Sequence, residues 1–333
     1  MIHLEDALEL DLEATATQLA AALSRAVLRR LRRRGIVVAV SGGIDSACVA
    51  ALSVKAVGAE RVFALLLPER DSSPDSLVYA KALCEKLGIA YLVKDIAPML
   101  EAAGCYEART AAVREVFPEF SADMPWKIVL ASDPLQSESL HFFQLVVRVP
   151  SGEERRFRLP PREYMQIVAA TNFKQRTRKM LEYYHADRLN YAVAGTPNRL
   201  EYDQGFFVKL GDGAADVKPI AGLYKGQVYA LSRHLGVTAE ILEREPTTDT
   251  YSLEQSQEDF YYSLHYSKLD LILWAKNHGL APETIAESLG YRPEQVRRVF
   301  DDIDQKRRAT TYVHAPPLLL EHVEGPHQLP PDE

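Results

Sequence analysis

The chain has 333 residues, 47% of them hydrophobic, which is enough for one large α/β domain with appendages or for two domains. A formal net charge of −7 argues against a general nucleic-acid-binding protein, and no apolar run has the length of a membrane span. The three cysteines lie far apart without a C-x-x-C pair, which is typical of reduced cytosolic thiols and gives no zinc site or persulfide-carrying pair. We therefore expect a cytoplasmic protein.

The N-terminal stretch, residues 1–35, is predicted to be one long helix from about Glu5 to Arg34, because leucines recur on one face. It ends in a run of arginines before Gly35. Such a cluster is typical either of a nucleic-acid-binding patch or of a solvated helix C-terminus, where cations suit the helix dipole and a glycine caps the last turn. We favour the second interpretation.

Residues 37–40 predict a strand buried on both faces of a sheet, because four small and β-branched residues follow one another. Two glycines then break the pattern, and a helix begins at Asp45. A strand, a glycine turn and a helix N-terminus direct backbone N–H groups toward one point, where the dipole favours an anion. Asp45 suits such a place only if a cation lies between it and a phosphate. The pattern therefore predicts a polyphosphate site with a magnesium ligand, formed by Ser41, Gly42, Gly43, Asp45 and Ser46.

A simple helix N-cap would also place serine and glycine here, but the buried strand before the loop favours the phosphate site. The spacing differs from G-x-x-x-x-G-K-[ST], so the loop is not of the Walker type. It resembles the S-G-G-x-D-S loop of the PP-loop ATP pyrophosphatases. That resemblance implies an adenine nucleotide alpha hydrolase-like fold and cleavage of ATP between its α and β phosphates.

Further strands are expected at residues 62–67, 90–93 and 191–194, with helices between them. Strands that alternate with helices indicate right-handed crossovers, and hence a doubly wound parallel sheet. Because loops at the carboxyl ends of such strands form the ligand crevice, residues 70–73 should lie beside the phosphate site; a plain connecting loop is the alternative. Residues 117–161 interrupt the alternation and contain a predicted β-hairpin, so we interpret them as an insertion.

After the insertion, a helix is expected from Thr171 to about Ala186, and another from Tyr224 to Leu235. Lys225 lies in the first turn of the latter helix, where a cation opposes the dipole and is expected to serve a bound anion. The remainder is predicted to be helical, with a helix-turn-helix-like stretch at residues 281–296. Its glutamates and the net charge oppose a DNA-binding role.

Taken together, the motifs are similar to those of the NAD synthetase family. The motifs in chain order are S-G-G-x-D-S, N-x-K-x-R-x-R, G-T-x-N-x-x-E, G-x-F-x-K-x-G-D-G-x-x-D-x-x-P, L-x-K-x-Q and E-P-T-x-D. The resemblance extends from Val37 to Arg308, the insertion excepted. It divides the chain into an N-terminal helix (1–35), a PP-loop ATPase domain (36–310) and a tail (311–333).

The resemblance implies a role for each matching residue. Implied contacts of ATP are Ser41, Gly42, Gly43, Asp45, Ser46, Thr196, Lys225 and Thr247. Implied contacts of deamido-NAD are Arg176, Lys209, Asp216 and Lys306. Mg²⁺ would be bound by Asp45 and Glu201, with Asp45 and Lys225 as catalytic residues. Gln305 stands where some members have histidine, and Ile44 where some have glutamine.

The resemblance implies Mg²⁺- and ATP-dependent amidation of deamido-NAD to NAD⁺ through an acyl-adenylate, with release of AMP and pyrophosphate. It also implies a homodimer. No glutaminase domain is recognised, so the ammonia is expected to be free or to come from a separate glutaminase. A ligase for another carboxylate is the alternative, ahead of a sulfurtransferase or a non-enzymatic regulator. The insertion is interpreted either as an edge decoration or as a specificity element for the acceptor.

Overall fold

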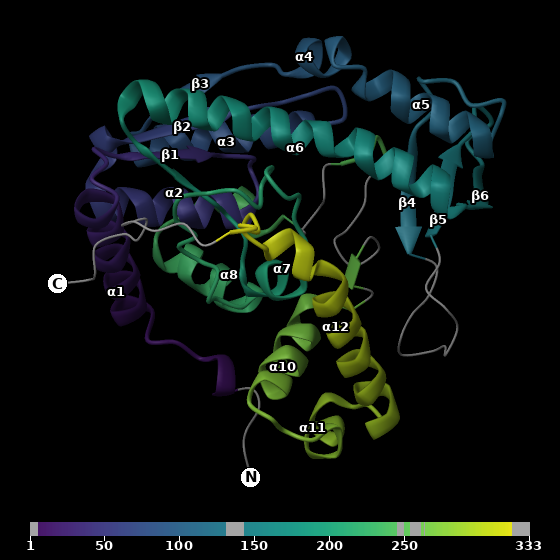
Figure 1. Cartoon of the computed structure of the whole chain (residues 1–333). Helices are drawn as coiled ribbons and strands as arrows, with labels where there is room; N and C mark the ends of the chain where they lie inside the picture. The colour runs from purple at the N-terminus through teal and green to yellow at the C-terminus, as the bar shows by residue number, and fades with distance from the viewer. Residues whose placement is uncertain (1–5, 131–142, 245–249, 254–260, 263, 322–333) are drawn as a thin grey trace.

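The computed structural model describes residues 6–130, 143–244, 250–253, 261–262 and 264–321. Its centre is a parallel four-stranded sheet with the order β3-β2-β1-β7 (Figure 1). The strands are β1 (Ile36–Ala39), β2 (Val62–Leu66), β3 (Ala90–Val93) and β7 (Ala192–Ala194).

Helices cover both faces of this sheet, which confirms the predicted doubly wound α/β fold. The side chains of Ile36 and Val38 enter one hydrophobic core, and the side chain of Val37 enters the other, as the two-residue period of a strand requires. The helices of the first face are α1 (Leu12–Arg25), α2 (Ile44–Val57), α3 (Pro74–Leu87), α8 (Lys225–His234) and α9 (Ala239–Leu242). The helices of the second face are α4 (Ala97–Ala102), α5 (Cys105–Val116) and α6 (Pro161–Leu189).

The prediction of one helix from Glu5 to Arg34 is wrong at both ends. Among the described residues, α1 begins only after Asp11, whose side chain accepts a hydrogen bond from the backbone N–H of Ala14. A 3-10 turn (Asp6–Leu8) precedes it, and a π-helical turn (Ala26–Arg30) follows it. Gly35 does not cap a helix. It is required because a Cβ there would lie 2.3 Å from the carbonyl oxygen of Arg61.

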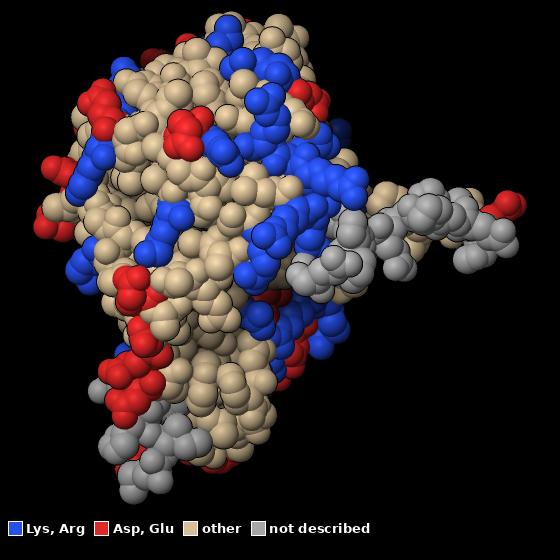
Figure 2. All heavy atoms as spheres, turned by 90° about the vertical axis from the view of Figure 1, so that its left-hand side faces the viewer, with Lys and Arg blue, Asp and Glu red and all other residues tan. Residues whose placement is uncertain are grey.

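Of the arginines after α1, Arg30 is half-buried and the others are exposed. Arg33 donates a hydrogen bond to Oδ1 of Asn190 at 2.6 Å, and Arg32 and Arg34 are exposed. Figure 2 shows the face that carries α1, where lysine and arginine side chains gather in a band beside scattered acidic groups. Both interpretations of the cluster stay open.

The insertion forms a separate antiparallel sheet of three strands, one more than the predicted hairpin. These strands are β4 (Trp126–Leu130), β5 (Phe143–Arg148) and β6 (Glu154–Arg158). One face of this sheet packs against α5, the first turns of α6 and Tyr251. α6 has 29 residues and begins at Pro161, well before the predicted start at Thr171. It therefore runs from the inserted sheet across the central sheet (Figure 1).

The C-terminal helices form a core of their own, next to α7 (Arg199–Gln204). They are α10 (Tyr266–Asn277), α11 (Pro282–Leu289) and α12 (Pro293–His314). The buried faces of α11 and α12 pack against each other and α10. In the part of the chain that the structure describes, no helix combines the length and apolar character needed to cross a bilayer. All three cysteines, Cys48, Cys84 and Cys105, are buried free thiols.

Candidate active site

The loop between β1 and α2 is closed by hydrogen bonds of its own serines. Ser46 Oγ donates to the carbonyl oxygen of Gly43 at 2.9 Å and accepts from the backbone N–H of Ser41 at 3.2 Å. Gly42 has φ +82°, and a Cβ there would lie 2.4 Å from the carbonyl oxygen of Ser76. Only glycine fits this position. The two serine hydroxyls, predicted as phosphate donors, therefore also fix the shape of the loop.

A cleft of about 260 Å³ opens beside this loop, at the carboxyl ends of β1 and β2. Ser41, Gly43 and Asp45 line it from one side, and Ser72 and Ser73 from the other. The expectation that residues 70–73 lie beside the loop of residues 41–46 is thus confirmed for Ser72 and Ser73, whereas Arg70 and Asp71 do not line the cleft. The other polar and charged side chains that line the cleft include Ser76, Gln175, Arg178, Lys179, Glu182, Thr196, Asp212, Lys225 and Arg244.

Asp45, the predicted magnesium ligand and catalytic residue, is held by two neighbours. One carboxylate oxygen forms an ion pair with Nζ of Lys225, and the other accepts a hydrogen bond from Nδ2 of Asn198 at 2.9 Å. Lys225 is buried; although burial lowers the pKa of an ammonium group, Asp45 and Glu201 outweigh that effect and raise the pKa of Lys225. Lys225 is therefore a permanent cation at the base of the cleft.

Glu201, the second predicted magnesium ligand, lies beside this pair. Asn198 and Glu201 form a capping box at the start of α7, in which the backbone N–H of Asn198 donates to Glu201 Oε2 at 3.1 Å. Burial, followed by the negative charge of Asp45, raises the pKa of Glu201 to about 8. Asn198 thus connects the two carboxylates. It belongs to the G-T-x-N-x-x-E motif but was not among the predicted site residues.

Asp270 is a further residue of the site that no sequence motif marks. Its carboxylate accepts hydrogen bonds from the backbone N–H groups of Lys225 at 3.2 Å and Gly226 at 2.7 Å, at the N-terminus of α8. Burial raises the pKa of Asp270 to about 7 despite these bonds. The carboxylate of Asp270 therefore compensates the positive end of the α8 dipole. The side chain of Lys225 points instead to Asp45.

The described residues that line the cleft include none of the four predicted contacts of deamido-NAD. Arg176 and Lys209 are neighbours, since Arg176 Nε donates to the carbonyl oxygen of Lys209 at 3.3 Å. Asp216 accepts a hydrogen bond from the backbone N–H of Val193 at 2.8 Å, on the edge strand β7 of the central sheet. Lys306 pairs with Asp302 at 2.8 Å on α12.

Two threonines remain among the predicted contacts of ATP. Thr196 lines the cleft, and Thr247 lies outside the described residues. The side of α6 that faces the cleft also contributes residues that were not among the predicted contacts. Lys179 and Glu182 there form a buried ion pair of 2.7 Å. Their spacing, three residues apart on a helix, was the available signal.

The donor set at Asp45 and Glu201 fits a divalent cation. Two carboxylates close together in a buried place repel each other, and the charge of Asp45 adds to the effect of burial in raising the pKa of Glu201. Hard oxygen donors of this kind are the ligands that Mg²⁺ prefers. Among the described side chains, Lys225 is the only cation that forms an ion pair with Asp45.

Comparison with known proteins gives a consistent result. The NAD synthase family model matches residues 16–116 and 155–310, and leaves 117–154 unmatched. The chain is 53% identical over 324 residues to an NH(3)-dependent NAD(+) synthetase of Rhizobium meliloti, covering 97% of this chain and 96% of the relative. It is 36% identical over 277 residues to the Thermotoga maritima protein of that name, covering 83% of this chain and 90% of the relative.

Solved structures have the same fold. The chain is similar to the NMN synthetase of Francisella tularensis with a TM-score of 0.64 and 24% identity, covering 94% of this chain and all of that one. It is similar to an NH3-dependent NAD synthetase of Campylobacter jejuni with a TM-score of 0.61 and 23% identity, at the same coverage. With the family model and the relatives in agreement, the chain belongs to the NAD synthase family.

Proposed function

We propose that this protein is an ammonia-dependent NAD⁺ synthetase, a carbon–nitrogen ligase. The observation that carries the proposal is the 53% identity, over 97% of the chain, to a relative named NH(3)-dependent NAD(+) synthetase. The cleft beside residues 41–46 agrees with it, because a glycine-turn loop at a helix N-terminus suits the phosphates of ATP.

In the proposed reaction, a carboxylate oxygen of deamido-NAD attacks the α-phosphorus of ATP, and the bond to the β-phosphate breaks. Pyrophosphate leaves, and ammonia then attacks the acyl carbon of the adenylate and displaces AMP. Lys225 is a buried cation at the base of the cleft, so it can stabilise the negative charge that develops on the leaving pyrophosphate. The loop and α6 side chains orient the nucleotide for the attack.

Magnesium would be held by Asp45 and Glu201 and would supply further positive charge to the phosphates. Support comes from the two adjoining carboxylates, whose repulsion a cation relieves. Asn198 orients Asp45 through its side chain and contacts Glu201 through its backbone N–H. Lys225 keeps Asp45 paired when no other cation is near.

The acceptor side of the proposal rests on Arg176, Lys209, Asp216 and Lys306. Because these residues lie outside the cleft, the acceptor would approach from the side of α6 and α12. A ligase for another carboxylate is the alternative substrate assignment. The cytoplasmic location stays a prediction.

We also propose that the protein is a homodimer in which a second copy covers α6. Met165, Phe173, Met180 and Tyr184 are exposed large side chains of this helix. Together with the exposed Arg176, they fall within an arc of roughly 100° on the helix surface. An apolar stripe of this kind on a soluble protein is typical of an interface. It would place Arg176 at the subunit boundary.

The deciding experiment measures AMP and NAD⁺ in the presence of ATP, Mg²⁺, ammonium and deamido-NAD. We expect both products in equal amounts, and neither when deamido-NAD is omitted. Nicotinic acid mononucleotide (the deamido form of nicotinamide mononucleotide) and simple carboxylates serve as competing acceptors. AMP release that prefers one of these over deamido-NAD would support the alternative ligase, and no AMP release with any acceptor would refute the adenylation chemistry.

A further inference from the structure

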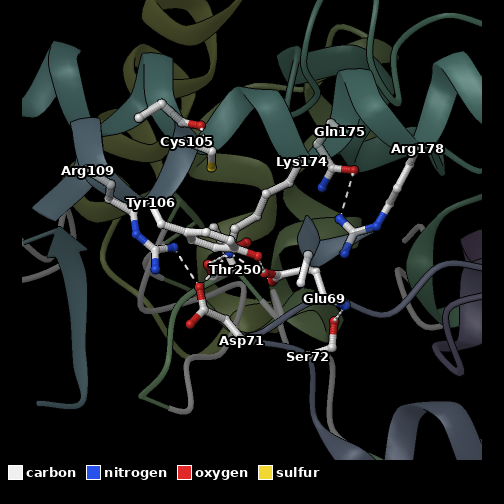
Figure 3. A network of polar contacts seen from close by, with 12 residues as sticks. Glu69, Asp71, Ser72, Cys105, Tyr106, Arg109, Lys174, Gln175, Arg178 and Thr250 are labelled. Atoms are coloured by element: carbon white, nitrogen blue, oxygen red, sulfur yellow. Dashed lines mark hydrogen bonds and ion pairs between the residues drawn. The ribbon is translucent and has the colours of Figure 1, made fainter. Parts of the chain in front are cut away.

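A buried lysine in α6 lies next to the cleft without lining it. Lys174 is only 2% exposed, and its Nζ donates to Glu69 Oε1 at 2.8 Å, to Asp71 Oδ2 at 2.7 Å and to the carbonyl oxygen of Thr250 at 2.8 Å. All three donors of the ammonium group therefore have an acceptor. Figure 3 shows the side chain of Lys174 reaching from α6 toward Glu69 and Thr250.

Two side chains of α5 complete this network. Arg109 pairs with Asp71 at 2.5 Å, and the hydroxyl of Tyr106 donates to Glu69 Oε2 at 2.9 Å. The cluster thus balances two cations against two carboxylates. Burial alone would raise the pKa of Asp71, but Lys174 and Arg109 outweigh it and lower that pKa. Removal of one cation would leave a buried negative charge without a partner, which is costly.

Glu69 and Asp71 belong to the loop of residues 67–73, which forms one wall of the cleft. Within this loop, the cleft is lined by Leu67, Pro68, Ser72 and Ser73, but not by the two acidic residues. Ser72 Oγ accepts a hydrogen bond from the backbone N–H of Glu69 at 3.1 Å. The serines consequently face the cleft, while both carboxylates are directed to α5 and α6. A carboxylate turned toward the cleft would repel a polyphosphate.

The same part of α6 also lines the cleft directly. Gln175 and Arg178 line the cleft, and Arg178 Nε donates to the carbonyl oxygen of Leu67 at 3.2 Å. The helix therefore holds the loop at two places, at Leu67 and at the acidic pair. The contact with Thr250 adds a third segment to the same lysine.

We propose that Lys174 is a positioning residue for the nucleotide. It fixes Glu69 and Asp71 on the side away from the cleft and so holds loop 67–73 in the shape that admits ATP. The proposal rests on the assignment of the cleft to ATP. Lys174 itself makes no contact with the reacting atoms.

The test replaces Lys174 by methionine, which keeps the length of the side chain and removes its charge. We expect K174M to raise the KM for ATP about tenfold, because a buried ion pair is broken. The KM for deamido-NAD should change little. A lysine with a purely structural role would instead lower the active fraction, and hence kcat, with the KM for ATP unaltered. Lys276→Met, in a partly buried ion pair of 2.9 Å with Asp304, is the matched control.

A second variant tests the charge balance. K174M leaves two carboxylates against Arg109, whereas K174M/E69Q leaves one, so the double variant should recover most of the affinity for ATP. If K174M is insoluble, Lys174→Gln takes its place with the same expectation. A normal KM for ATP in the single variant, or no recovery in the double variant, would overturn the role of Lys174.

The proposed function is tested separately by binding. Calorimetric titration of wild type with a non-hydrolysable ATP analogue should give a dissociation constant that K174M weakens. Wild-type protein that binds no nucleotide would refute the ATP site itself, whereas equal binding by both proteins would refute only the inference about Lys174.

Discussion

Asp45 and Lys225 are mutual partners, and each is also suited to a bound substrate. The buried ion pair satisfies both charges in the free protein. A polyphosphate in the cleft would offer Lys225 a second anion, and a divalent cation would offer Asp45 and Glu201 a second positive charge. Asn198 keeps a hydrogen bond to each of the two carboxylates. Binding of both would therefore let Asp45 and Lys225 exchange partners without leaving either buried charge unpaired.

We expect Asp45→Asn and Glu201→Gln each to lower AMP formation at least tenfold, which corresponds to about 1.4 kcal/mol of barrier. Both substitutions remove a charge of the proposed magnesium site and keep an oxygen acceptor. Glutamine is preferable to alanine at residue 201 because the Glu201 side chain caps α7. The measurement is AMP release as a function of Mg²⁺ concentration, and the variants should need more Mg²⁺.

The control for these variants is Glu13→Gln, in an exposed cluster on α1. It should leave the Mg²⁺ dependence unchanged. An Asp45→Asn enzyme that keeps more than about a tenth of wild-type activity would remove the magnesium assignment, since the loss would then be under 1.4 kcal/mol.

Asp270 should make the free energy of unfolding depend on pH. Its pKa is raised to about 7, mainly by burial, from an ordinary value of 3.8. Between these values the folded protein binds more protons than the unfolded chain, so stability is highest at low pH and falls as pH rises toward 7. Lys225 opposes the shift and Asp45 reinforces it.

Denaturant titrations of the metal-free protein at pH 5 and pH 8 measure this effect. We expect Asp270→Asn to reduce the decrease in stability between the two pH values by on the order of 2 kcal/mol. A variant with the same pH dependence as wild type would show that Asp270 is not a proton-linked group.

At the scale of elements, the sequence predicts what is local and misses what depends on distant partners. The strand–loop–helix unit at residues 37–52 follows from periodicity and glycine placement, and the structure confirms it. Asn198 and Asp45 are 153 residues apart, so no periodic pattern could join them. Lys174 lies in a basic stretch that resembles a solvated helix face. It is buried only because the carboxylates of another loop meet it.

The start of α6 was missed although its signal is present. Pro161 is at the first turn and Glu163 follows it, which is a typical helix N-terminus. The predicted insertion extends to residue 161 and therefore conceals this boundary. The sequence does not mark strand β4, because residues 131–142 separate it from its partner strand β5 and no tight turn signals the pairing.

Trp126 is the main anchor of the inserted sheet, and its removal should be costly. It is 3% exposed, and its ring lies 4.9 Å from that of Tyr251 and 5.1 Å from the guanidinium carbon of Arg109. We expect Trp126→Ala to lower the free energy of unfolding by about 3 kcal/mol, as for other buried tryptophans. Denaturant titration measures it.

Arg156→Ala, at an exposed position of β6 in the same sheet, is the comparison for Trp126→Ala. It should change the stability by less than about 0.5 kcal/mol. Equal effects of the two substitutions would mean that the sheet is not held through Trp126.

At the scale of the whole molecule, the exposed stripe of α6 determines the expected assembly. Met180→Glu should convert the proposed dimer into a monomer, because a buried unpaired charge at an interface is unfavourable. Light scattering at micromolar concentration gives the mass directly. Val78→Glu places the same charge on an exposed position of α3 and should leave the dimer intact. A wild-type mass near that of one chain would refute the dimer.

The three buried cysteines have a practical consequence. Burial raises the pKa of Cys48 and of Cys84 to about 12, so neither thiol ionises at neutral pH while the chain is folded. Cys105 is enclosed as well, and its pKa is also raised by burial. A thiol-specific dye therefore reacts only when the protein opens, and any substrate that binds the folded state slows that opening. The rate of thiol labelling therefore reports how much of the protein has ligand bound, and it can be measured in variants that have lost all catalytic activity.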